Sequence, residues 1–306
     1  MKDTTKAHLM IGAATLLIST SFPVVKGIAG SLDSLVLTLL RFVLASVLFL
    51  PVVLVAHRKQ LMPTGRSFVR YAILSAPLVG FFLAMFEALR TSTAINTGAL
   101  ATFGPGFAAL FASLLVHERL GGRRLLALVT GMVGAVWVVF RGDPARVLQL
   151  ELVEGDWIFL AGTASLGLYS VLIQLLHRGE ATAVMTFWTL VTGSLWLLAF
   201  GWSDLADVEW PAVEPRVLLW IAYLAFFTTL LSFFLNQKAV TVLGPTRTMA
   251  YSYLNPALVA LLAWGLGQDA IGWPAVPGIA LTLVSMLVLQ RGAAPTSYGR
   301  SGISRP

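Results

Sequence analysis

The sequence contains no cysteine and few charged residues. Because none of its 306 residues is cysteine, disulfides, cysteine-ligated metal sites and thiol catalysis are excluded. Charged residues make up 11% of the chain, whereas soluble globular domains average about 25%. This shortage of charge excludes an ordinary soluble domain.

The groupings of residues that metal or nucleotide chemistry requires are also missing. The carboxylates and the 4 histidines do not group at metal-ligand spacing, and no GxxxxGK[ST] loop occurs to bind ATP. The net charge of +7 would suit a nucleic-acid partner, but the basic residues do not gather with aromatic ones on a soluble face. We therefore expect no metal, no cofactor and no nucleic acid.

Long apolar runs dominate the sequence instead. Hydrophobic residues make up 57% of it, and its mean hydropathy is +0.83. A helix needs about 20 apolar residues to cross a bilayer core of about 30 Å, whereas a spanning barrel would alternate in polarity. The runs predict an all-α integral membrane protein with ten transmembrane helices, at residues 8–28, 35–56, 71–90, 97–116, 124–140, 157–176, 183–201, 217–238, 248–267 and 273–290.

The charges predict the orientation of these spans. An even number of spans puts both termini on one side, and if that side is the cytoplasm, 15 of the 21 basic residues lie in cytoplasmic segments. Residues 9–18 resemble a secretory signal, but no convincing cleavage site follows, so they are interpreted as part of a retained first span. We expect a multi-pass protein of the bacterial inner (plasma) membrane, embedded in the lipid bilayer with both termini cytoplasmic.

The outer segments receive most of the acidic residues. With this orientation, 11 of the 14 carboxylates face the outside. They include Asp33, Asp204, Asp207 and Glu209.

Part of the sequence repeats at a shift of 151 residues. Residues 88–121 and 239–272 align without a gap and are identical at 9 of 34 positions, including Thr97 with Thr248. Two copies of one unit are therefore predicted. Because five spans per copy is an odd number, the second copy begins on the opposite side, so the repeats are inverted. The predicted divisions are 1–142 for the first five-helix repeat, 143–156 for a periplasmic connecting loop, 157–290 for the second repeat and 291–306 for a disordered cytoplasmic tail.

A proline lies near the middle of the fourth span and another at the matching position of the ninth. Pro105 is flanked by glycines, and Pro256 follows Asn255. A proline inside a helix removes a backbone hydrogen bond, so both spans are expected to bend near the membrane midplane. An ordinary kink is one interpretation. The other interpretation is a substrate site in a water-filled midplane cavity. Interruptions at matching positions of an inverted repeat favour this second interpretation.

Aromatic and amide side chains surround these two breaks. Rings with one polar tip suit a cavity for an amphipathic solute, although each ring alone equally suits packing. The predicted substrate-binding residues are Phe103, Pro105, Phe107, Tyr169, Tyr251, Tyr253, Asn255 and Pro256.

Several charged residues lie inside the predicted spans. Lys26, Arg41 and Glu87 lie near the outer ends of the first three, and the expected ion pair joins Glu87 to Arg41 or Lys26. The shift of 151 carries Glu87 onto Lys238, near the opposite surface, which suits two alternating gates. These four residues are predicted to act in gating or coupling. A structural ion pair, snorkelling and a positive-inside anchor at Lys238 are the alternatives.

Ionisable residues at the cytoplasmic helix ends favour structural roles. Glu118 ends the fourth span, where a carboxylate opposes the helix dipole and needs a cation such as Arg119, Arg123 or Arg124. Three histidines at such ends are interpreted as interfacial: His57, His117 and His177.

Small residues form a ladder on one face of the fifth span, at Ala127, Gly131 and Ala135. Such a ladder permits close helix packing. It serves either packing within one protomer or a homodimer.

Three short patterns resemble those of a known family. They are the pair Arg41-Phe42, the run from Pro105 to Glu118-Arg119-Leu120, and its echo from Asn255-Pro256 to Asp269. Over about residues 10–290 the chain resembles EamA-type members of the drug/metabolite transporter superfamily. The resemblance implies export of small organic metabolites, such as amino acids or drug-like compounds, by alternating access through a central cavity.

The sequence departs from the family pattern in two places. Asp269 is followed by Ala270, where the family usually has Glu and a longer polar turn, and residues 19–21 lack the tryptophan often found in the first span. Both departures bear on which metabolite is carried.

We predict a secondary transporter for a small-molecule substrate, with a midplane cavity between the two repeats. An intramembrane lipid-modifying enzyme is one alternative, for which His117 and Glu118 lack a convincing second acid. A passive channel is the other.

Overall fold

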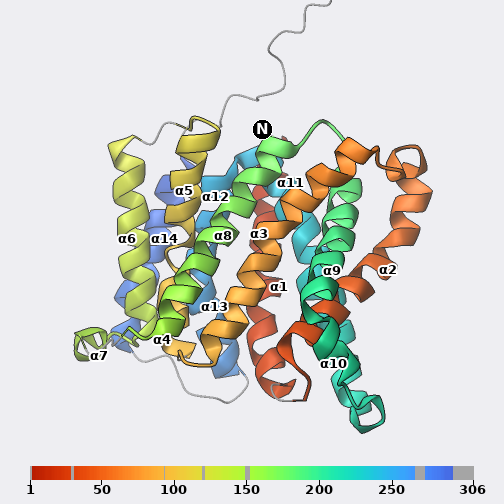
Figure 1. The fold of residues 1–306 in the computed structure, drawn as a ribbon. Helices are drawn as coiled ribbons and strands as arrows, with labels where there is room; N and C mark the ends of the chain where they lie inside the picture. The colour runs from red at the N-terminus through yellow and green to blue at the C-terminus, as the bar shows by residue number, and fades with distance from the viewer. Residues whose placement is uncertain are drawn as a thin grey trace, which may run out of the picture.

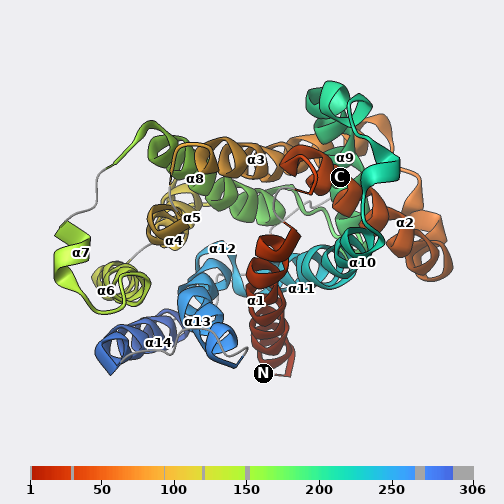
Figure 2. The same cartoon turned by 90° about the horizontal axis from the view of Figure 1, so that it is seen from below.

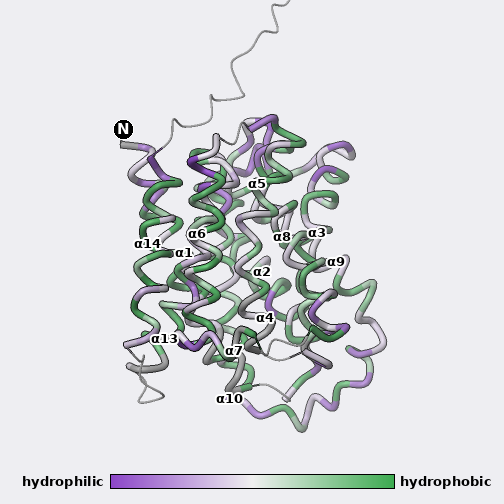
Figure 3. The backbone as a smooth tube through the Cα atoms, turned by 90° about the vertical axis from the view of Figure 1, so that its left-hand side faces the viewer, coloured by the Kyte–Doolittle hydropathy of each residue, from purple (hydrophilic) through white to green (hydrophobic). Residues whose placement is uncertain are grey.

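The computed structural model describes residues 2–28, 31–92, 94–118, 121–148, 152–265 and 273–291. Over these residues the chain is helical and contains no strand, which confirms the predicted all-α class for the described part. The helices run side by side as one bundle (Figure 1). Hydrophilic segments concentrate at its two ends (Figure 3). Within the described ranges, seven helices are long and apolar enough to cross a membrane.

The first three helices run alternately down and up the bundle. α1 (Lys2–Ile28) descends from the N-terminus at what we call the upper end, α2 (Ser34–Leu61) returns, and α3 (Gly65–Leu89) descends again (Figure 1). Asp33 and Thr64 cap α2 and α3 by accepting backbone N–H bonds through their side chains. These caps fix where each helix begins.

The predicted fourth span consists of two helices rather than one bent helix. α4 (Ala94–Ala101) ends before Thr102, and α5 (Gly104–Leu115) begins two residues later. Pro105 lies in the first turn of α5, where its missing N–H would have had no partner within the helix. α6 (Gly122–Val139) follows. The connecting loop predicted at 143–156 contains a short helix, α7 (Pro144–Leu148).

The second part of the chain repeats this pattern of long and interrupted helices. One helical segment includes η2, a π-helix, between two α-helices, and another includes η3, a 3₁₀-helix. The elements are α8 (Glu154–Leu176), α9 (Thr182–Ala206), η1 (Trp210–Ala212), α10 (Pro215–Tyr223), η2 (Leu224–Leu231), α11 (Ser232–Leu243), α12 (Pro245–Met249), η3 (Ala250–Leu254), α13 (Asn255–Gly265), η4 (Trp273–Ala275) and α14 (Val276–Gln290).

Helices from the two parts of the chain pack against each other. α3 lies along α8, α2 along α9, α1 along α11 and α6 along α14 (Figure 2). The largest buried core joins Phe42 and Leu74 to Ile173 and Leu190. Residues before and after the connecting loop therefore share one apolar interior.

Candidate functional site

The two helix interruptions adjoin each other inside the bundle. A Cβ built on Gly104, at the start of α5, would lie 3.2 Å from Met249 Cε at the end of α12, and 3.7 Å from Thr163 Cγ2 on α8. Pro105 is buried in the first turn of α5, and Pro256 is partly buried in the first turn of α13. The structure thus brings together the breaks that the two prolines predicted.

α1 supplies polar partners to the second break. Ser19 Oγ donates to Asn255 Oδ1 at 3.3 Å, and the His8 Nδ1 and Tyr251 hydroxyl oxygen are 3.0 Å apart. Two of the predicted substrate residues, Tyr251 and Asn255, are therefore held by α1.

Two other predicted substrate residues are engaged in packing. The hydroxyl of Tyr253 donates to the carbonyl oxygen of Leu128 on α6 at 2.8 Å, and its ring lies against Gly131. Tyr169, which is 3% exposed, accepts a bond of 3.0 Å from Gln237 Nε2. Both tyrosines are therefore held by partners within the protein.

The two predicted phenylalanines differ in environment. Phe107 packs against Gly167 of α8, where a built Cβ would lie 2.9 Å from Phe107 Cβ. Phe103 lies between α4 and α5 and is 37% exposed. Phe107 is partly buried, so Phe103 is the more exposed of the two rings.

Three unpartnered polar atoms, two on α8 and one in η3, were missed by the sequence reasoning. Within the described residues, Ser170 Oγ and Gln174 Oε1 on α8 and Ser252 Oγ in η3 are buried without a hydrogen-bond partner. Buried polar groups in proteins are nearly always bonded, so such atoms suit a site for water or a polar solute. The available signal was the spacing of Ser170 and Gln174, four residues apart on one face of an apolar helix.

The small-residue ladder of α6 packs inside the protomer. A Cβ built on Gly131 would meet the Tyr253 ring at 2.5 Å and Ser285 Cβ at 3.0 Å. Ala127 and Ala135 lie in the same buried cluster as Tyr253. Packing between α6, η3 and α14 therefore accounts for the ladder.

Arg41 is buried in the interior, where hydroxyl groups are its partners. Its Nη2 donates to Thr228 Oγ1 at 3.2 Å and to Thr229 Oγ1 at 3.1 Å, and its Nε donates to Thr229 Oγ1 at 3.3 Å. The guanidinium carbon is 5.9 Å from the centroid of the Phe82 ring. Arg41 thus connects α2, η2 and α3.

The expected ion pair between Glu87 and Arg41 does not occur. Glu87 Oε2 instead lies 3.1 Å from Arg90 Nη1, one helical turn away, and both side chains are mostly exposed. The side chain of Lys26 lies outside the described residues. Lys238 is exposed in the middle of α11.

Glu118 connects the two interrupted helical segments at the upper end. Its Oε1 is 3.5 Å from Arg124 Nη1, which agrees with the predicted cation partner, and its Oε2 accepts a 2.9 Å bond from Thr246 Oγ1 of α12. A second ion pair at this end joins Arg70 of α3 to Glu180 before α9, at 2.9 Å.

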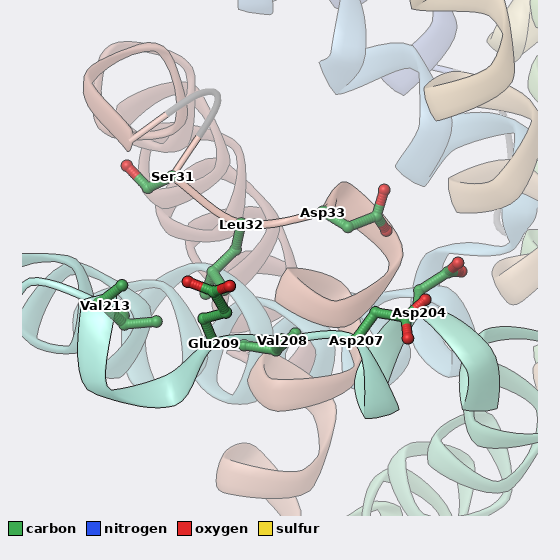
Figure 4. A pocket seen from close by; sticks show the side chains of 9 residues that line it. Ser31, Leu32, Asp33, Asp204, Asp207, Val208, Glu209 and Val213 are labelled. Atoms are coloured by element: carbon green, nitrogen blue, oxygen red, sulfur yellow. The ribbon is translucent and has the colours of Figure 1, made fainter.

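A hollow of about 410 Å³ lies at the lower end, away from both breaks. Asp33 lines it from the start of α2, and Asp204, Asp207 and Glu209 line it from the end of α9 and the following loop (Figure 4). Among the described residues, no group of three or more His, Asp or Glu side chains is arranged to hold a metal ion.

Comparison with known proteins identifies the family. The model of the EamA-like transporter family matches residues 5–140 and 153–291. The uncharacterized transporter YyaM of Bacillus subtilis is 21% identical over 74% of this chain and 75% of its own length. A riboflavin transporter of Brucella anthropi is 26% identical over 89% of this chain and 93% of its own.

A solved crystal structure shares the fold. It superposes with a TM-score of 0.74 at 20% sequence identity and covers 94% of this chain and 99% of its own. Because the family model matches most of the sequence, the resemblance seen in the short sequence patterns is confirmed. This chain belongs to the EamA-like transporter family, and it is a multi-pass membrane transporter rather than an enzyme.

Proposed function

We propose that this transporter exports small organic metabolites across the bacterial inner membrane by alternating access between two inverted five-span halves. The two interrupted helices are the observation that carries the proposal. α5 begins at Gly104 and α13 at Asn255, which are 151 residues apart, and the two interruptions adjoin. Interrupted helices at matching positions of two halves are typical of a substrate site near the bilayer midplane.

The same shift of 151 residues relates other helices of the two halves. It carries Gly122–Val139 onto Trp273–Gln290, and it carries the start of α4 at Ala94 onto Pro245, the start of α12. The family model likewise matches two stretches of similar length, 5–140 and 153–291. These correspondences support division of the chain into two copies of one unit.

Helix directions and packing support inversion of the second half. α1 runs downward from the N-terminus, whereas its counterpart α8 runs upward (Figure 1). If the two halves are exchanged, the pair α3–α8 becomes the pair α11–α1, and the pairs α2–α9 and α6–α14 map onto themselves. Such exchange is expected for a two-fold axis in the membrane plane. In the proposed orientation, the upper end of the bundle, which carries the N-terminus and Arg291, faces the cytoplasm.

We infer that the unpartnered polar atoms of Ser170 and Gln174 on α8 and of Ser252 in η3 offer hydrogen bonds to the solute. Substitution of these residues is expected to lower transport without lowering the stability of the fold. Replacing a buried group that has a partner costs stability, whereas removing an unpartnered one does not. The double variant S170A/Q174L, which nearly keeps the side-chain volume at position 174, is therefore expected to keep or raise Tm while it lowers transport.

The test uses purified protein in proteoliposomes with a panel of labelled metabolites that includes amino acids and riboflavin. We expect saturable uptake of at least one solute, with trans-stimulation, and a reduced rate for S170A/Q174L. S46A is the matched control, because Ser46 Oγ donates within α2 to the Phe42 carbonyl oxygen at 2.8 Å. Flux without saturation or trans-stimulation would favour the passive channel, and no flux for any solute would contradict the proposal.

A further inference from the structure

Arg41 is a buried cation whose protein partners are neutral. It is 6% exposed and donates three hydrogen bonds to the hydroxyls of Thr228 and Thr229. Within the described residues, no carboxylate lies at ion-pair distance from it; the acids Glu87, Glu118 and Glu180 pair with other cations. Buried arginines are normally paired, because transfer of an isolated charge out of water is expensive. The structure therefore has a positive charge without an opposite charge.

The hydrogen-bonding groups around Arg41 that have no partner within the described residues are donors. Arg41 Nη1 has no partner among the described residues. The Thr228 hydroxyl donates to the Leu224 carbonyl oxygen at 3.0 Å, so its proton is in use. The Thr229 oxygen accepts from Arg41, and its own O–H has no acceptor within the described residues. Two unused donors beside a cation suit the two oxygens of a carboxylate.

Helix packing alone does not require a charge at this position. The shift of 151 residues carries Arg41 onto Thr192 of α9. Thr192 Oγ1 makes a neutral bond of 2.9 Å to Ser75 Oγ on α3, and the pair α9–α3 corresponds to the pair α2–η2 that Arg41 joins. The same kind of junction is thus made by two hydroxyls in the other half.

The local backbone of the threonines is also unusual. Thr228 and Thr229 belong to η2, a π-helical segment within an otherwise α-helical span. π-helical turns are rare and frequently occur at functional sites. Arg41 is seven residues beyond Ser34, about 10 Å along α2 at 1.5 Å per residue, which places it inside the span rather than at its end.

We propose that Arg41 and Thr229 bind the carboxylate group of the transported solute, so that the substrates are organic carboxylates. This inference rests on the proposed transport function and specifies its substrate class. Arg41 Nη1 and the Thr229 hydroxyl donate to the two carboxylate oxygens. Thr228 and the Phe82 ring hold the guanidinium in position.

The test compares carboxylates with the carboxamides of the same shape. Thermal shift and proteoliposome uptake are measured with nicotinate and nicotinamide, benzoate and benzamide, and glutamate and glutamine. For wild type we expect at least one carboxylate to raise Tm and to be preferred over its amide by about tenfold or more, as charge-assisted hydrogen bonds give. In R41Q this ratio is expected to fall to about one.

Matched variants keep the result interpretable. T192V, which removes the neutral hydroxyl at the corresponding junction, is expected to leave the ratio unchanged. If R41Q does not fold, T229V retains the charge and removes the hydroxyl, and it is expected to lower the ratio.

The outcomes separate this inference from the proposed function. Saturable transport of neutral solutes with no preference for any carboxylate overturns the carboxylate site and leaves transport intact. The carboxylate site is likewise overturned if R41Q folds and keeps the preference for carboxylates. If R41Q does not fold, a T229V variant that keeps the preference overturns the site. A panel in which no carboxylate raises Tm also overturns it. A shift in Tm by a carboxylate that R41Q abolishes, without uptake of any solute, supports the site and contradicts transport.

Discussion

Glu118 and Thr246 join the two interrupted helical segments at the upper end of the bundle. The Thr246 hydroxyl donates to Glu118 Oε2 at 2.9 Å, and the Glu118 side chain is 9% exposed. One residue follows α5 and the other belongs to α12, so the bond connects the two proposed halves. In the proposed alternating-access cycle, opening at this end would break the bond.

We predict that T246V favours opening at the upper end. A hydrogen bond to a partly buried carboxylate contributes about 1.5–3 kcal/mol, so its loss shifts the equilibrium by about tenfold or more. Because the chain has no cysteine, a single S252C substitution provides a reporter without background. A membrane-impermeant maleimide applied to inside-out vesicles is expected to label S252C/T246V about tenfold faster than S252C.

The matched control is T241V, because the Thr241 hydroxyl donates within α11 to the Lys238 carbonyl oxygen. It is expected to leave the labelling rate of S252C unchanged. Equal rates in the T246V and T241V backgrounds would show that the bond to Glu118 does not hold this end closed.

The contact between Gly131 and Tyr253 predicts a loss of stability on enlargement of the glycine. A Cβ at position 131 would lie 2.5 Å from the Tyr253 ring, which is 1% exposed and has no free space to enter. G131A is therefore expected to cost about 1–3 kcal/mol, measured as a lower Tm of the purified protein. G122A is the control, because a Cβ there meets no atom within 4 Å. Equal Tm values for the two variants would contradict this packing.

The hydroxyl of Tyr253 allows a separate measurement. Y253F keeps the ring and removes the 2.8 Å bond to the Leu128 carbonyl oxygen. The expected cost is about 1 kcal/mol, with no change in solute affinity, because Tyr253 packs on α6. A large loss of solute binding at unchanged Tm would show that Tyr253 belongs to the substrate site.

His177, which directly follows α8, predicts a dependence of stability on pH. Burial lowers its pKa below the ordinary value of 6.5; the charge of Glu180 opposes this shift, and those of Lys238 and Arg70 add to it. As pH falls below about 6.5, the unfolded chain takes up a proton at this side chain before the folded one does. The stabilisation is thus fully present above pH 6.5 and is lost as pH falls toward the lower folded pKa.

The measurement is Tm between pH 7.5 and pH 5 for wild type and H177N. Part of the acid-induced decrease in Tm is expected to disappear in H177N, since its amide does not titrate in this range. Parallel curves for the two proteins would contradict the role of burial at His177.

Sequence patterns predicted the interrupted helices because proline restricts the backbone wherever it occurs. Pro105 and Pro256 both lie in the first turn of a helix that starts at a break. The direction in which Tyr253 points was harder to predict from the sequence, because η3 is a 3₁₀-helix. Each 3₁₀ residue turns about 20° more than an α-helical one, which amounts to about 100° over five residues.

The sequence patterns did not predict the partners of Arg41. Glu87 binds Arg90, its neighbour one turn along α3, and this local contact was available from the spacing alone. Arg41 instead binds Thr228 and Thr229, which are 187 and 188 residues away. Their segment, LAFFTTLL, is an apolar run in which no pattern indicates a π-helix or a partner for a cation.

The prolines at the breaks are predicted to affect transport more than stability. In the first turn of a helix, a proline replaces an N–H that has no partner within the helix, so P105A and P256A are expected to change stability by less than about 1 kcal/mol. Each alanine restores an N–H that lets the helix continue through the break. If the breaks serve transport, each variant slows uptake by about tenfold, about 1.4 kcal/mol in the barrier, at unchanged Tm.

The control is P51A, because Pro51 is an exposed proline inside α2, away from both breaks. It is expected to transport at the wild-type rate. Because all three variants remove one proline from a membrane helix, a common effect on folding or insertion would lower their rates alike. A tenfold loss confined to P105A and P256A therefore assigns the interruptions to the transport cycle, whereas wild-type rates in both would make them ordinary kinks.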